Sequence, residues 1–177
     1  MSMDDSAIPR GVATIGNEAT AVVHFDGASQ QIRGERIATY GFTLVGIGEP
    51  IEDCGLAVPP GAPHATNNVA EYCGAICALE RLHSEGFRGH VVVRGDSQLV
   101  IRQMTGEYRV ESEHLKAYHD RLSQLVRQFT VVRFEWVPRE QNVRADELSK
   151  DALEVELTRR TRAGRSGGAG AGGPRST

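Results

Sequence analysis

The chain has 177 residues, of which 40% are hydrophobic and 24% are charged, so it fits one globular domain with a core large enough to fold alone. Residues 158–177 contain five arginines and no acidic residue. The preceding residues therefore contain 15 of the 20 basic residues and all 23 acidic ones. This negative net charge argues against a simple nucleic-acid-binding protein. No apolar run reaches the roughly 20 residues of a membrane span and the N-terminus lacks a signal peptide, so we expect a cytoplasmic protein without membrane association.

The first half of the chain predicts three strands followed by a helix. Residues 1–18 lack periodicity and are expected to form a flexible leader. The segments "TAVVHFDGAS", closed by Gly27, "RIATYGFTLVGIG" and "PIEDCGLAVPPG" are rich in β-branched and aromatic residues and are separated by Gly and Pro. Their short spacing predicts an antiparallel meander. A helix is then expected from about Asn67, because an apolar stripe recurs at helical spacing at Val69, Cys73, Ile76 and Cys77.

The second half predicts two further strands and three helices. "GHVVVRGDS" is typical of a short strand buried on both faces, and "SQLVIRQMTG" of a short helix stopped by Gly106. An amphipathic helix is expected over residues 112–129, followed by the strand "TVVRFEWVP" and the helix "NVRADELSKDALEVEL". The last two elements complete a domain over 19–157, and the Arg- and Gly-rich segment 158–177 is expected to be disordered.

This order predicts an α/β fold with a five-stranded mixed sheet and helices on both faces. The first three strands pair antiparallel, whereas the first, fourth and fifth strands run parallel because helices connect them. The only tryptophan, Trp136, is expected in the core.

Four carboxylates are predicted to meet at one rim of this sheet. Asp26 and Asp96 stand near the carboxyl ends of two neighbouring parallel strands, the edge where open sheets place ligands. Glu71 and Asp146 are expected in the first turns of two helices. Each residue alone also has a structural explanation. Glu71 and Asp146 could be partners of helix dipoles, Asp26 could shape a turn, and Asp96 could cap the following helix.

The convergence itself indicates divalent cations. Two unit charges about 4 Å apart repel by roughly 4 kcal/mol at an effective dielectric constant of 20. Hard cations with oxygen ligands remove this cost, and Mg²⁺ suits a site of few carboxylates, water and a substrate phosphate. Two such ions can activate a water and stabilise a leaving oxygen, which is the chemistry of phosphodiester hydrolysis.

Four motifs in order over residues 20–155 resemble the type 1 ribonuclease H family, in its compact form without a basic handle. They are "FDGAS" at 25–29, "TNNVAEY" at 66–72, "RGDSQLVIRQMTGEY" at 94–108 and "FEWVPREQNVRADELSKDAL" at 134–153. The resemblance implies a ribonuclease H-like fold. It also matches Asp26, Glu71, Asp96 and Asp146 to the catalytic and metal-binding carboxylates of the family.

The resemblance further implies an endonuclease that cleaves the RNA strand of RNA–DNA hybrids, leaving a 5′-phosphate and a 3′-hydroxyl. It implies Mg²⁺ or Mn²⁺ as cofactor, with two ions when substrate is bound. The substrate-binding residues that it implies are Gly27, Ala28, Ser29, Asn67, Asn68, Gln98 and Asn142. The amides would read the wide minor groove, where the 2′-hydroxyl separates RNA from DNA. Either Thr66 or Asn67 could instead act only as a helix cap.

Two departures from the family qualify this reading. The loop "VPREQNVRAD" has no histidine, and Glu140 and Asn142 are both open as partial replacements. Without a basic handle, we expect weaker hybrid affinity that depends strongly on low salt. Another nuclease, or a non-catalytic nucleic-acid-binding module, on the same fold are the alternative functions. No obligatory protein partner is evident, and a monomer is expected.

Overall fold

The computed structural model describes residues 19–166, so the predicted leader and the end of the predicted tail lie outside the described residues. The strands are β1 (Thr20–Ile32), β2 (Glu35–Val45), β3 (Ile51–Leu56), β4 (His90–Gly95) and β5 (Val131–Trp136). The helices are α1 (Asn67–Ser84), α2 (Gln98–Met104), α3 (Glu113–Val126) and α4 (Val143–Ser166), with a 3-10 turn at Arg139–Gln141. None of these helices is both long enough and apolar enough to cross a membrane.

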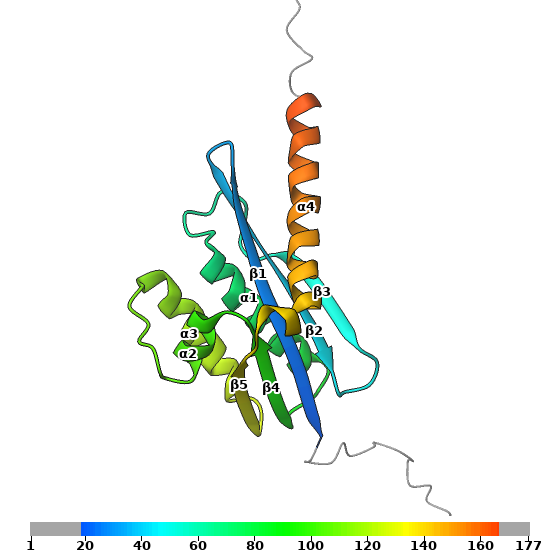
Figure 1. The fold of residues 1–177 in the computed structure, drawn as a ribbon, viewed down its shortest axis with the longest axis vertical. Coiled ribbons are helices and arrows are strands. Elements are labelled where there is room, and N and C mark those ends of the chain that lie inside the picture. The colour runs from blue at the N-terminus through cyan, green and yellow to red at the C-terminus, as the bar shows by residue number, and fades with distance from the viewer. Residues whose placement is uncertain (1–18, 167–177) are drawn as a thin grey trace, which may run out of the picture.

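All five strands form one mixed sheet in the order β3-β2-β1-β4-β5. β2 pairs antiparallel with β1 and with β3, whereas β4 pairs parallel with β1 and with β5. This confirms the predicted meander and the parallel neighbours. Figure 1 shows α4 crossing one face of the sheet while α1 lies behind the other. The sheet is therefore the middle layer between helices.

The core lies mainly between the sheet and α1. The helix buries an almost complete face that includes Tyr72, Leu79 and Leu82, against the fully buried Phe25 and Val93 of the sheet. Burying a large apolar side chain contributes about 1.5–3 kcal/mol, so this face anchors α1 to β1 and β4.

β1 is longer than predicted. It does not end at Gly27 but continues to Ile32, because β2 supplies a partner for each residue as far as the Ile32–Glu35 pair. The strands join through a two-residue turn in which Arg33 and Gly34 both have positive φ, 49° and 86°, as the right-handed twist of a hairpin favours.

α4 is also longer than predicted, because residues 158–166 continue the helix instead of being disordered. Ion pairs hold the added turns. Arg160 donates to Glu156 at 2.8 Å and also pairs with Glu35 at the start of β2. Since the long hairpin of β1 and β2 reaches this part of α4, the helix has a partner that the sequence pattern did not reveal.

Candidate metal centre

The parallel pairing of β1 and β4 places two carboxylates side by side. The last parallel pair is His24–Arg94, and Asp26 and Asp96 each lie two residues further along the chain, Asp96 directly after the end of β4. Both therefore reach the carboxyl edge of the sheet, as the sequence predicts. Asp96 is not the cap of α2, because the Ser97 hydroxyl accepts the hydrogen bond from the main-chain N–H of Val100 instead.

Glycines let α1 bring a third carboxylate to the same edge. A Cβ on Gly27 would lie 2.3 Å from the main-chain N of Glu71, and one on Gly74 would lie 2.9 Å from the main-chain O of Asp26. Strand and helix thus touch through their main chains at this point. Any larger residue at Gly27 would move Glu71 away from Asp26.

Glu71 does not lie where the sequence placed it within α1. It is the fifth residue of the helix rather than a first-turn residue, and no acid occupies that first turn. The helix is capped by Thr66, whose hydroxyl accepts from the main-chain N–H of Val69 at 3.3 Å. A purely dipolar role for Glu71 is therefore weakened, because the helix dipole acts within about one turn.

Asp26, Glu71 and Asp96 form a compact carboxylate cluster. One oxygen of each lies within 4.8 Å of the others, and the side chains of Asp26 and Glu71 are buried. Glu71 Oε1 accepts from Asn67 at 3.3 Å, but its buried Oε2 has no partner among the described residues. A buried carboxylate oxygen without a donor is costly and indicates a missing ligand.

Burial and mutual repulsion hold protons on this cluster. Burial raises the pKa of Asp26 to about 7; the charges of Asp96 and Asp146 act in the same direction, and a hydrogen bond from Ser149 acts against them. Burial also raises the pKa of Glu71 well above its usual range, with smaller contributions from Asp26 and Asp96. The cation-free site thus resists full ionisation, and a divalent ion would displace its protons.

Asp146, the fourth predicted carboxylate, lies at the rim of the cluster but outside the group of three. It occupies the first turn of α4, as predicted. Its two oxygens are held by Arg139 at 2.7 Å and by Lys150 at 2.6 Å. Asp146 is close enough to raise the pKa of Asp26, yet joining the cluster requires it to exchange these cationic partners.

Two neutral side chains orient the cluster. Ser149 donates to Asp26 at 2.5 Å, a contact that the sequence analysis missed although Ser149 lies one helical turn after Asp146. Asn142 donates to the main-chain O of Phe25 at 2.8 Å and to Asp96 at 3.2 Å. Only 1% of Asn142 is exposed, so in this structure it supports the Asp96 carboxylate rather than facing a substrate.

The other predicted substrate-binding residues differ in exposure. Asn67, Asn68 and Gln98 are exposed at the starts of α1 and α2, and Asn67 donates to Glu71 of the cluster. On β1, Ala28 and Ser29 are half-buried, whereas Gly27 lies buried beneath α1. The amide side chains are therefore the ones open to a ligand.

Trp136 is not in the core, where the sequence analysis placed it. It ends the edge strand β5 opposite Gly95, and 47% of it is exposed. Its indole N–H donates to the main-chain O of Asp96 at 3.1 Å. The indole therefore lies at the rim of the sheet, where it holds the main chain of Asp96.

The matching family model is described as "Reverse transcriptase-like" and covers residues 52–152. A curated relative, ribonuclease HI of Halobacterium salinarum, is 38% identical over 132 residues, which are 74% of this chain and 63% of that protein. The bifunctional protein Rv2228c of Mycobacterium tuberculosis is 40% identical over 91 residues, which are 51% of this chain. The chain spans about a quarter of the length of this mycobacterial relative (25%).

Solved structures share the same architecture. The N-terminal RNase H domain of Rv2228c superposes with a TM-score of 0.70 at 30% identity, covering 80% of this chain and 99% of that one. LC11-RNase H1, whose structure contains an RNA/DNA hybrid, superposes with a TM-score of 0.67 at 31% identity, covering 77% and 99%. Both similarities extend over nearly all of the described domain.

Proposed function

Because this chain belongs to the type 1 ribonuclease H family, we propose that its carboxylate cluster hydrolyses the RNA strand of RNA–DNA hybrids. The observation that carries the proposal is the convergence of Asp26, Glu71 and Asp96 from β1, α1 and the end of β4. Among the described residues, no cationic side chain lies within 4 Å of any of these three carboxylates, so a cation from solution can bind there. The relative of known structure that holds a hybrid supports the choice of substrate.

Mg²⁺ or Mn²⁺ fits this donor set. The three carboxylates are hard oxygen ligands, and the unpartnered Oε2 of Glu71 points to a coordination position rather than to a structural hydrogen bond. Asp26, Glu71 and Asp96 would hold these ions, and Asp146 would join them when substrate is bound. Such ions supply an activated water and stabilise the leaving oxygen, which gives 5′-phosphate and 3′-hydroxyl ends.

The chain's own residues would orient these ligands and select the strand. Asn142 and Ser149 fix the carboxylates of Asp96 and Asp26 by hydrogen bonds. Arg139, at 65% side-chain exposure, can leave Asp146 for a backbone phosphate, which would free one oxygen of that carboxylate as the substrate arrives. Substrate binding and completion of the site are thereby coupled.

Strand choice rests on the exposed amides. Asn67, Asn68 and Gln98 carry both donors and acceptors and lie beside the cluster, where a 2′-hydroxyl of the minor groove can be read. Replacing Asn68 by Ala should lower cleavage of the hybrid while leaving the fold unchanged. Gln124→Ala, an exposed amide on α3, is the matched control and should cleave as the wild type does.

The decisive assay uses end-labelled hybrid, double-stranded RNA and double-stranded DNA, each with Mg²⁺, Mn²⁺ or EDTA. Cleavage confined to the RNA of the hybrid, absent in EDTA and in Asp96→Asn but retained in Asp120→Asn, supports the proposal. Equal cleavage of duplex DNA would indicate another nuclease on this fold. Tight binding of the hybrid without cleavage would indicate a non-catalytic binding module.

A further inference from the structure

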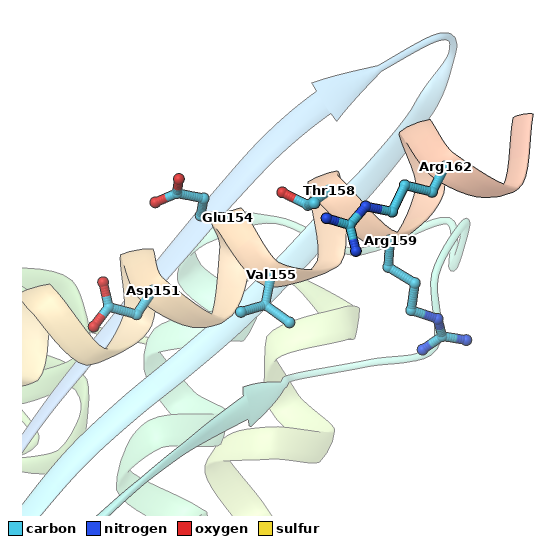
Figure 2. A pocket seen from close by; sticks show the side chains of 6 residues that line it. All are labelled: Asp151, Glu154, Val155, Thr158, Arg159 and Arg162. Carbon is cyan, nitrogen blue, oxygen red and sulfur yellow. The ribbon is translucent and has the colours of Figure 1, made fainter. Parts of the chain in front are cut away.

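The outward face of α4 carries exposed side chains that the proposed chemistry does not use. They line a shallow groove along the helix (Figure 2): Asp151, Glu154, Val155, Thr158, Arg159 and Arg162. Val155 is 68% exposed, more than any other large hydrophobic residue in the described chain. Val155 is thus the one apolar side chain of this groove, and the other five side chains that line it are polar or charged.

The opposite face of this part of α4 is already occupied. Leu157 and Arg160 lie beside the hairpin of β1 and β2, and the buried Glu156 pairs with Arg160. Residues 151, 155, 158 and 162 recur at helical spacing on the other side of the helix. The stripe therefore lies on the side of α4 away from this hairpin, and its side chains are exposed apart from the nearness of Asp151 to Cys54 of β3.

Charges along the stripe are separated by sign. Asp151 and Glu154 lie towards one end, Arg159 and Arg162 towards the other, and Val155 and Thr158 lie between them (Figure 2). Asp151, Glu154 and Arg162 make no ion pair with the described side chains of residues 19–163, and among these Arg159 has a single ion pair, at 3.5 Å, with Glu156. These side chains are available to a partner that carries the reverse order of charges.

The order of charges along this stripe is complementary to that of a second copy running in the opposite direction. About the midpoint between residues 156 and 157, Val155 mirrors Thr158, and Asp151 mirrors Arg162. A twofold axis at this midpoint sets a second α4 antiparallel to the first, with each acidic half facing a basic half and Val155 beside Thr158 of the other copy. Such an isologous contact is the usual form of a homodimer interface.

We propose that this face of α4 binds a second copy of the same chain, in an antiparallel helix pair. A nucleic acid fits less well, because Asp151 and Glu154 would repel its phosphates next to the two arginines. One apolar layer flanked by ion pairs makes a small interface, so the pairing is reversible and concentration-dependent. The expected monomer is then the dilute form of an equilibrium.

Charge reversal with complementation tests this interface. Arg159→Glu with Arg162→Glu makes the stripe acidic throughout, and Asp151→Arg with Glu154→Arg makes it basic throughout. Each variant should self-associate at least about tenfold more weakly than the wild type, because like halves now meet. An equimolar mixture of the two should associate again, since every half then faces its opposite.

Sedimentation velocity on the full chain, from low-micromolar to sub-millimolar concentration at low and high salt, supplies the measurement. The mass should rise from 19.2 kDa towards twice that value at low salt and fall back at high salt. Arg127→Glu with Arg133→Glu, two exposed arginines away from α4, controls for net charge and should associate as the wild type does. Unchanged far-ultraviolet circular dichroism and hybrid cleavage show that each variant is folded.

Three results would overturn the proposal. The wild type could stay at 19.2 kDa at the highest concentration in low salt. Both charge-reversed variants could dimerise as the wild type does, which would place the interface elsewhere. The mixture could fail to associate, which would show that the lost association did not depend on opposed charges.

Discussion

Replacing Asp96 by Asn should make the cation-free protein more stable while it abolishes cleavage. Asp96 lies within 4.8 Å of Asp26 and Glu71, and two unit charges at that distance repel by roughly 3 kcal/mol at an effective dielectric constant of 20. Burial raises the pKa of Glu71 well above its usual range, so only the pair with Asp26 is counted. Because Asp96 is partly exposed, solvent screens this pair, and we expect a gain of about 1–2 kcal/mol.

Urea unfolding in EDTA measures this gain. At about pH 8, above the pKa of Asp26 near 7, the repulsion is present and the variant should be the more stable protein. At about pH 5 Asp26 is protonated in the folded state, so the two proteins should differ little. Asp120→Asn, whose side chain is 75% exposed, is the control and should show no gain. A variant less stable than the wild type at the higher pH would refute the reasoning, as would an equal gain at both.

Three further predictions concern the same centre. The pKa of Asp26 is about 7 in the folded protein and near 3.8 in the unfolded chain, so the free energy of unfolding without cations should fall as pH rises from about 4 to 7. The apparent affinity for Mg²⁺, measured by calorimetry, should rise with pH over about 6 to 8, because the cation displaces this proton. Gly27→Ala should lower the free energy of urea unfolding by about 3 kcal/mol or more, because the added Cβ would lie 2.3 Å from the main-chain N of Glu71. Gly55→Ala is the control and should lower it by under about 1 kcal/mol, because the nearest atom to its Cβ would lie 3.4 Å away. Equal losses in the two variants would contradict the close contact at Gly27. Asn142→Ala should lower kcat more than it raises KM, because Asp96 loses the donor that orients it. It should also destabilise the protein by about 1–3 kcal/mol, because the main-chain O of Phe25 loses its hydrogen bond from Asn142. An unchanged kcat would exclude the positioning role of Asn142.

Strand and helix order was predictable because it follows from hydrophobic periodicity. The short buried strand β4 and the stripe on α1 are local patterns, and the crossover between them requires parallel pairing of β1 with β4. That pairing is enough to bring Asp26 and Asp96 together. The meeting of these two carboxylates with Glu71 was therefore accessible from sequence.

What sequence could not supply depends on contacts between distant segments. The extension of α4 past residue 157 depends on Glu35, which lies more than a hundred residues earlier at the start of β2. The exposure of Trp136 depends on β5 being an edge strand with its last residue at the rim. The retention of Asp146 by Arg139 and Lys150 depends on rotamers, which no periodic pattern encodes.

The glycine contact between β1 and α1 has a consequence for redesign of this protein. Because Gly27 and Gly74 let main chain meet main chain, the spacing between Asp26 and Glu71 does not depend on the packing of any intervening side chain. Core substitutions elsewhere along α1 can therefore change the melting temperature without changing the spacing of these two carboxylates. Libraries that aim to raise the melting temperature should therefore keep Gly27 and Gly74 and vary residues near the C-terminal end of α1.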